Sequence, residues 1–84
     1  MKATVTVVGN DKVGIIAKVS AKLAQCEINI LDISQTIMQD IFTMIMLVDT
    51  EKSTKNIEEI SNELKALSDE IGFEIIIQHQ GIFK

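Results

Sequence analysis

One stretch near the start of the chain decides the fold, and it reads Val7-Val8-Gly9-Asn10-Asp11-Lys12-Val13-Gly14-Ile15-Ile16. Before it, Lys2 to Val8 alternates apolar and polar residues, which predicts a strand with one buried face. After it, apolar residues recur at helical spacing as far as Cys26. The stretch therefore predicts a strand that ends at a glycine-containing turn and leads directly into a helix. Asp11 is placed to cap the first turn of that helix.

The same turn is the first candidate for a binding site. Gly9 and Gly14 allow the backbone to bend sharply or to approach another group closely. A helix N-terminus presents unpaired N–H groups and the positive end of the helix dipole. The strand end, the turn and the helix N-terminus together predict a small polar platform that favours an anion. The rest of the chain is predicted to be its scaffold.

Outward from the turn, five further elements are predicted. The first helix spans about residues 13–26, with Ile16, Val19, Leu23 and Cys26 on its apolar face. The second and third strands span about 29–38 and 41–49 and form a hairpin through Gln39-Asp40. The second helix spans about 55–71, capped by Ser53 or Thr54 and stopped by Gly72, and the last strand spans about 73–79. The first strand is predicted over about 2–8.

This order of elements predicts an α+β fold, the ferredoxin-like βαββαβ sandwich, in a single domain over residues 1–84. Its four-stranded antiparallel sheet carries both helices on one face. The third strand is apolar on both faces, as a central strand covered on both sides would be. The other face of the sheet would carry Thr4, Thr6, Ile76 and Gln78 together with one face of the third strand, and a monomer would leave part of it exposed. A homodimer is therefore expected, formed either by joined sheet edges or by stacked open faces.

The composition excludes several function classes. The net charge is −4, the eight basic residues are all lysine, and phenylalanine is the only aromatic residue, so the basic and aromatic surfaces typical of nucleic-acid binding are missing. Cys26 is the single cysteine, which excludes an internal disulfide and a Cys-pair metal site. No apolar run reaches the ~20 residues that span a bilayer, and Met1–Val8 alternates unlike a signal peptide. A cytoplasmic protein without membrane contact is expected.

The sequence also predicts no catalytic residues, metal or cofactor. Nothing in it combines a nucleophile, a base and an oxyanion site. The one histidine, His79, lies at the end of the last predicted strand, where a surface or sheet-edge histidine is expected. Met44 and Met46 are expected in the core or in an interface. An enzyme is therefore not predicted.

The turn and the start of the second strand resemble the ACT domain, a family of small regulatory modules that bind amino acids or similar metabolites. The family's loop commonly reads Asp-Arg-Pro-Gly-Ile/Leu, and Asp11-Lys12-Val13-Gly14-Ile15 matches it with two substitutions. Asn29-Ile30 is similar to the Asn-Ile that opens the family's second strand. The resemblance covers Lys2 to about Gln78. More narrowly, the chain resembles free-standing ACT proteins related to glycine-cleavage repressor-type regulators. It departs from the family where Val13 replaces the usual proline and Glu27 the usual glycine.

This resemblance implies a ligand site in and after the loop that begins at Asn10. Backbone N–H groups near Val13, Gly14 and Ile15 would hold the carboxylate of a small amino acid, and Asp11 would pair with its ammonium. Asn29, from the neighbouring subunit or from the chain's own second strand, would complete the contacts. Ile16 and Ile30 would limit the side chain that the site accepts. A site between two domains is common in the family, which agrees with the expected homodimer and with regulation of a partner protein.

Simpler interpretations of these residues stay open at this point. Asp11 is explained by helix capping alone, Gly14 by close packing of helix on sheet, and Asn29 by the turn into its strand. Lys12 is explained as a solvated side chain. The alternative function is accordingly a ligand-free dimerisation or protein-interaction module on the same scaffold.

Overall fold

A computed structural model describes residues 2–10 and 13–79 of the 84-residue chain. Its elements follow one another in the predicted order: β1 (Lys2–Asn10), α1 (Ile15–Gln25), β2 (Asn29–Met38), β3 (Ile41–Asp49), α2 (Ile57–Ile71) and β4 (Glu74–His79). The hairpin strands have the predicted bounds. β1 is two residues longer than predicted, and both helices and β4 begin one or two residues later. The ferredoxin-like α+β fold is confirmed.

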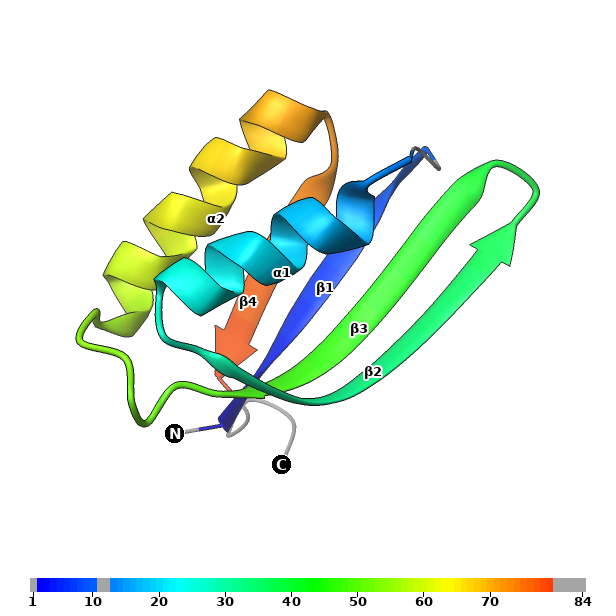
Figure 1. Ribbon diagram of the computed structural model, residues 1–84. Coiled ribbons are helices and arrows are strands. Elements are labelled where there is room, and N and C mark those ends of the chain that lie inside the picture. The colour runs from blue at the N-terminus through cyan, green and yellow to red at the C-terminus, as the bar shows by residue number, and fades with distance from the viewer. Residues whose placement is uncertain (1, 11–12, 80–84) are drawn as a thin grey trace.

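The strands form an antiparallel sheet in the order β2-β3-β1-β4. At its centre Val5 lies opposite Met46 on one side and Ile77 on the other. Both helices cover the same face of the sheet, and the hairpin of β2 and β3 extends beyond them (Figure 1). The elements therefore make two layers, with the core between the helices and the inner face of β1, β3 and β4.

The core is built from aliphatic side chains and methionine. Met44 and Met46 are fully buried, as predicted. On α1 the buried residues are Ile15, Val19 and Leu23, which recur at intervals of four. Ile16, predicted as part of this face, is instead partly exposed. Residues four apart lie on the same side of a helix, so Val19 and Leu23 share their buried side with Ile15 and not with Ile16.

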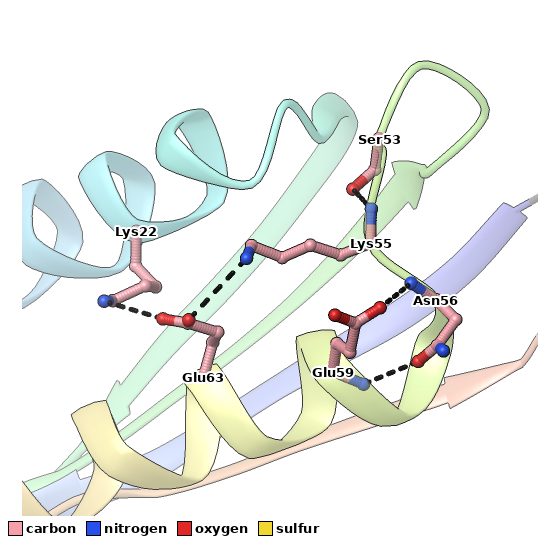
Figure 2. Close-up of polar contacts among 6 residues, drawn as sticks. All are labelled: Lys22, Ser53, Lys55, Asn56, Glu59 and Glu63. Carbon is pink, nitrogen blue, oxygen red and sulfur yellow. Dashed lines mark hydrogen bonds and ion pairs between the residues drawn. The ribbon is translucent and has the colours of Figure 1, made fainter.

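The predicted cap of the second helix was wrong. α2 is capped by Asn56 rather than by Ser53 or Thr54, and Ser53 Oγ instead accepts a hydrogen bond of 3.2 Å from the Lys55 N–H (Figure 2). β3 is covered on one side only, because Ile41 and Ile45 on its outer face remain about half exposed. Its second apolar face has no covering element in the part of the chain that the structure describes.

Candidate ligand-binding site

The β1–α1 turn has its conformation set by a glycine. Gly14 has a φ of 87°, in the left-handed region, and is the N-cap residue of α1. Among the described residues other than its two chain neighbours, a Cβ placed on Gly14 would meet no atom within 4 Å. Close helix–sheet packing therefore does not explain this glycine, and that alternative is wrong. The positive φ explains it.

The helix N-terminus beyond Gly14 carries no side-chain cap among the described residues. No side chain accepts a hydrogen bond at this N-cap, and the first turn of α1 contains no acidic residue. The Gly14 carbonyl begins the helix by accepting a 3.0 Å hydrogen bond from the Lys18 N–H. The side chain of Val13 is fully exposed. The first N–H groups of α1 thus lack the intrahelical partners that later ones have. Asp11, the predicted cap, and Lys12 lie outside the described residues.

The glycine at the other end of the turn has a different role. A Cβ on Gly9 would lie 2.7 Å from two ring carbons of Phe73, which is closer than van der Waals contact allows. The Phe73 ring packs edge-on against Phe42, with 6.2 Å between the ring centroids. Gly9 is therefore a packing glycine, and it lets the Phe73 ring lie against the end of β1. This close approach is one of the two possibilities that the sequence left open.

The predicted residues near the turn divide by exposure. Asn10 is exposed at the end of β1, and Ile16 is partly exposed in the first turn of α1. Ile15 is buried in the core, so only its backbone is available at the surface. The turn can thus offer Asn10, Ile16 and backbone N–H groups to a ligand, while the Ile15 side chain cannot contact one.

Asn29 lies at the opposite end of the sheet. It opens β2 beside Asp49, whereas Asn10 closes β1 beside Ile41. Ile41 and Asp49 are the two ends of β3, about 27 Å apart at the usual rise of a strand. One chain therefore does not bring Asn29 to its own β1–α1 turn. Of the two alternatives for Asn29, only the one that uses a neighbouring subunit stays a prediction.

Asn29 lines a cleft of about 460 Å³ at its own end of the sheet. The cleft is lined by residues from the α1–β2 connection and from the end of β3: Glu27, Ile28, Asn29, Asp49, Glu51 and Lys52. Ile30, next along β2, is half-buried and packs against the core. Three carboxylates, one amide and one ammonium surround this space, so it favours a group of net positive charge.

A local hydrogen bond favours the ionised form of the Asp49 carboxyl. Its Oδ1 accepts a 3.0 Å hydrogen bond from the Glu51 N–H. This bond, with a smaller contribution from the positive charge of Lys2, lowers the pKa of the Asp49 carboxyl. Asp49 is therefore ionised at neutral pH. The described residues contain no group of three or more His, Cys, Asp or Glu side chains arranged to hold a metal ion.

The backbone next to this cleft is held in an unusual conformation. Glu27 has a φ of 59°, in the left-handed region that favours glycine. The Ile28 N–H donates to the Leu23 carbonyl at 2.9 Å, so α1 ends with the hydrogen bond of a Schellman motif. A non-glycine residue in the left-handed region costs about 1 kcal/mol. The motif turns the chain directly into Asn29.

Sequence reasoning did not find the carboxylates of the cleft. Glu27 is far from Asp49 and Glu51 in the sequence, and each of the three alone resembles an ordinary surface residue. The signal was the register of the predicted hairpin, because the start of β2 pairs with the end of β3. Following that pairing from the Gln39-Asp40 turn would have placed Asp49 opposite Ile30, one residue from Asn29, and the β-bulge between Ile30 and Asp32 moves Asp49 to Asn29.

Comparison with known proteins identifies the family of the chain. The family model of the ACT domain matches residues 3–78. The chain belongs to the ACT domain family. A UPF0237 protein of Clostridium acetobutylicum is 55% identical over 83 residues, which cover 99% of this chain and 93% of that protein.

Solved structures extend the comparison. An ACT domain protein from Streptococcus pneumoniae is 42% identical, with a TM-score of 0.88 over 100% of this chain and 94% of that one. A protein assigned as a glycine cleavage system transcriptional repressor is 26% identical, with a TM-score of 0.79 over 92% of this chain but 44% of that one. The resemblance read from the sequence is thus confirmed, including its narrower form. ACT domains are in general regulatory, ligand-binding modules. Within the described residues, no helix is long and apolar enough to cross a membrane.

Proposed function

We propose that this chain is a non-catalytic regulatory module of the cytoplasm that binds a small amino acid, or a similar metabolite, at the interface of a homodimer. Binding would then be reported to a partner protein. The predicted site has two parts, the β1–α1 turn and Asn29 with its cleft, which we call half-sites. The observation that carries the proposal is the position of these two half-sites. The β1–α1 turn and Asn29 lie at opposite ends of the sheet, and β2 runs along its open edge between them.

β2 has the surface of a strand that pairs with another chain. Nine of its ten residues are exposed. Ile33 and Ile37 pair with the buried residues Met46 and Phe42, so they point to the helix side, yet they are 44% and 54% exposed. Figure 1 shows why, since the helices do not extend over this edge. An exposed edge strand with apolar side chains is a template for strand addition.

Antiparallel pairing of two β2 strands would unite the half-sites. A two-fold axis through the middle of β2 places the start of one β2 beside the end of the other. Asn29 of one copy then lies at the end of the joined sheet that carries the partner copy's β1–α1 turn. Each dimer would contain two such composite sites, and each site would take residues from both copies.

The two half-sites have complementary chemistry for an α-amino acid. The helix N-terminus after Gly14 offers N–H donors and a positive dipole to a carboxylate. The cleft beside Asn29 offers the Asp49 carboxylate and the Asn29 side-chain oxygen to an ammonium. An amino acid between the copies would therefore bind one half-site through its carboxylate and the other through its ammonium group. Ile16 and Ile30 would limit its side chain.

A thermal-shift screen of the protein against the twenty amino acids at millimolar concentration tests the proposal. A ligand at one hundred times its Kd adds about 2.7 kcal/mol to stability, which raises the Tm of a chain this small by several degrees. Asp11→Ala and Asn29→Ala should each abolish the shift. The matched control is Asn62→Ala, on the exposed surface of α2, which should keep it.

A mixing experiment tests whether the site is shared between copies. Asp11→Ala and Asn29→Ala proteins are mixed, unfolded and refolded together. Random dimerisation then regenerates an intact site at about a quarter of the positions, because one of the two sites in each mixed dimer carries neither substitution. Recovery of binding, measured by calorimetry, supports the shared site. No recovery contradicts it. A flat screen with a stable dimer would instead support the ligand-free interaction module.

A further inference from the structure

The second edge of the sheet is β4, which pairs with β1 on one side and, among the described residues, with no strand on the other. Every second residue of an edge strand directs its N–H and C=O groups away from the sheet, where they need other hydrogen-bond partners. Natural edge strands are commonly protected by charged residues or by proline. β4 has ionisable residues only at its ends, Glu74 and His79, and its interior reads Ile75-Ile76-Ile77-Gln78. This edge is therefore able to pair with an added strand.

α2 forms a wall beside this edge. The helix and the strand lie side by side and run in opposite directions (Figure 1). A groove of about 300 Å³ follows them, and it is lined by residues 74–77 of β4 and, from α2, by Ser61, Lys65, Ser68 and Asp69. The Ser68 hydroxyl donates a hydrogen bond to the Phe73 carbonyl just before β4, which ties the helix to the start of the strand. The β4 edge thus combines a strand that can be paired with a helix surface that can select side chains.

The charges on this helix wall change sign at the repeat of a strand. Lys65 and Asp69 are both exposed and are four residues apart, so they are separated by about 6 Å along the axis of α2. Side chains on one face of a strand recur at every second residue, about 6.8 Å apart. In a strand added antiparallel to β4, a side chain that faces Lys65 is therefore followed, two residues later, by one that faces Asp69. Glu74 adds a second negative charge at the Asp69 end of the groove, because α2 ends where β4 begins.

We propose that the groove between α2 and β4 binds an extended segment of a partner protein, added antiparallel to β4, in which an acidic residue faces Lys65 and a basic residue two positions later faces Asp69. Strand addition supplies affinity through main-chain hydrogen bonds and specificity through alternate side chains. A second copy that paired through its own edge strand would not supply the basic residue, because neither β2 nor β4 contains lysine or arginine. The inference rests on the proposed function in one respect, since it states how the partner protein of that module would be recognised.

Peptide binding measured by fluorescence anisotropy tests the charge pattern. The probe is a labelled, end-capped peptide, Thr-Val-Glu-Val-Lys-Val-Thr, and its control is the same peptide with Glu and Lys exchanged. The protein should bind the probe about tenfold more tightly than the control, because two exposed charge pairs change sign between them. The double variant Lys65→Glu, Asp69→Lys should reverse this preference. Asn62→Glu, on a different side of α2, is the matched control and should keep it. Equal affinity for the two peptides, or a preference that the double variant does not reverse, would overturn the proposal.

A second pair of peptides tests the pairing with β4. In one probe the valine nitrogens are methylated, and in the other the glutamate and lysine nitrogens are methylated. Only one of these two sets of N–H groups faces the neighbouring strand, so one methylated probe should lose binding and the other should keep it. Retention or loss of binding by both would overturn strand addition.

Two further measurements separate this groove from the proposed amino-acid site and from self-association. Asn29→Ala should leave probe binding unchanged, and the Lys65→Glu, Asp69→Lys protein should keep the thermal shift with an amino acid. A flat amino-acid screen with intact probe binding would therefore contradict the proposed function and support the groove. A thermal shift without probe binding would do the reverse. A light-scattering mass that falls when the probe is added would identify a second copy as the occupant of the groove and overturn the proposal.

Discussion

The two helices of this protein begin in opposite ways. At α2, the Asn56 side chain accepts a 2.8 Å hydrogen bond from the Glu59 N–H, and the Glu59 carboxylate accepts a 3.0 Å bond from the Asn56 N–H (Figure 2). Glu58 adds a second acidic residue to that first turn. At α1, Gly14 supplies no side chain, and the first turn has no acid. The N-terminus of α2 is capped by its own side chains, whereas no side chain among the described residues caps that of α1.

The difference shows where each helix obtains its stability. α1 has a buried row of Ile15, Val19 and Leu23, and tertiary packing of such a face holds a helix without help from a cap. α2 combines a buried face with a capping box. The helix N-terminus for which the described residues supply no side-chain cap is the one at the turn that the sequence singles out as a ligand site.

The largest effect is expected from the two glycines with positive φ. Gly14→Ala and Gly72→Ala each place a Cβ in the left-handed region, at φ of 87° and 72°. Each should lower the free energy of unfolding by about 1–2 kcal/mol in urea titrations. If the proposed site is correct, only Gly14→Ala should also lose the ligand-induced thermal shift, because Gly14 and not Gly72 belongs to the proposed site. A Gly14→Ala protein as stable as the wild type would show that the turn does not require its positive φ.

The next largest effect is expected at the N-terminus of α2, which has the capping box. Asn56→Ala removes the acceptor for the Glu59 N–H and should lower stability by about 1 kcal/mol, or roughly 4–8 °C in Tm. Asn62→Ala, in the interior of the same helix, is the control and should change stability little, because alanine is a good helix former. Ligand binding should survive both substitutions. A loss of binding in Asn56→Ala would mean that the two helix N-termini are not independent.

Much of the fold could be predicted because local patterns and tertiary packing agree. The row from Ile60 to Ile71 and the alternation of β1 both follow from burial of one face, and both are present in the structure. The cap of α2 was missed by two or three residues. Ser53, Thr54 and Asn56 are all good N-cap residues, so the local signal was degenerate. The Glu at position 59, three residues after Asn56, was the distinguishing feature.

The candidate site was less predictable, because it depends on which residues meet in space. The motif indicated the turn at Gly14 and the residue Asn29, but not that they lie at opposite ends of one sheet. That separation follows from strand order and direction, which the motif does not contain. What covers the outer face of β3 is likewise not contained in the local pattern. An apolar strand face predicts burial but does not tell whether the covering element belongs to the same chain.

A smaller effect is expected where the two helices meet on the surface. Glu63 on α2 forms two ion pairs (Figure 2). Its Oε1 lies 3.2 Å from Lys22 Nζ on α1, and its Oε2 lies 3.9 Å from Lys55 Nζ. The three side chains are partly exposed, so Glu63→Gln should cost only a few tenths of a kcal/mol at low salt. At 1 M salt, where the Debye length is about 3 Å, the difference from the wild type should nearly vanish. A difference independent of salt would indicate packing of the side chain rather than charge.

The smallest effect concerns the hydrogen bond from the Glu51 N–H to the Asp49 carboxylate, which lies outside any helix. Asp49 accepts from the Glu51 N–H as Asn56 accepts from that of Glu59, but in an exposed connection. Because this bond lowers the pKa of Asp49 in the folded state, the carboxylate stabilises the fold above its unfolded pKa of about 3.9. That contribution is lost as the pH falls through the lower folded pKa. Urea unfolding of Asp49→Asn and wild type should therefore differ most near neutral pH and converge in acid. Glu51→Gln keeps the donating N–H and should preserve this convergence. A gap between Asp49→Asn and wild type that does not change with pH would show that the hydrogen bond does not favour the ionised form.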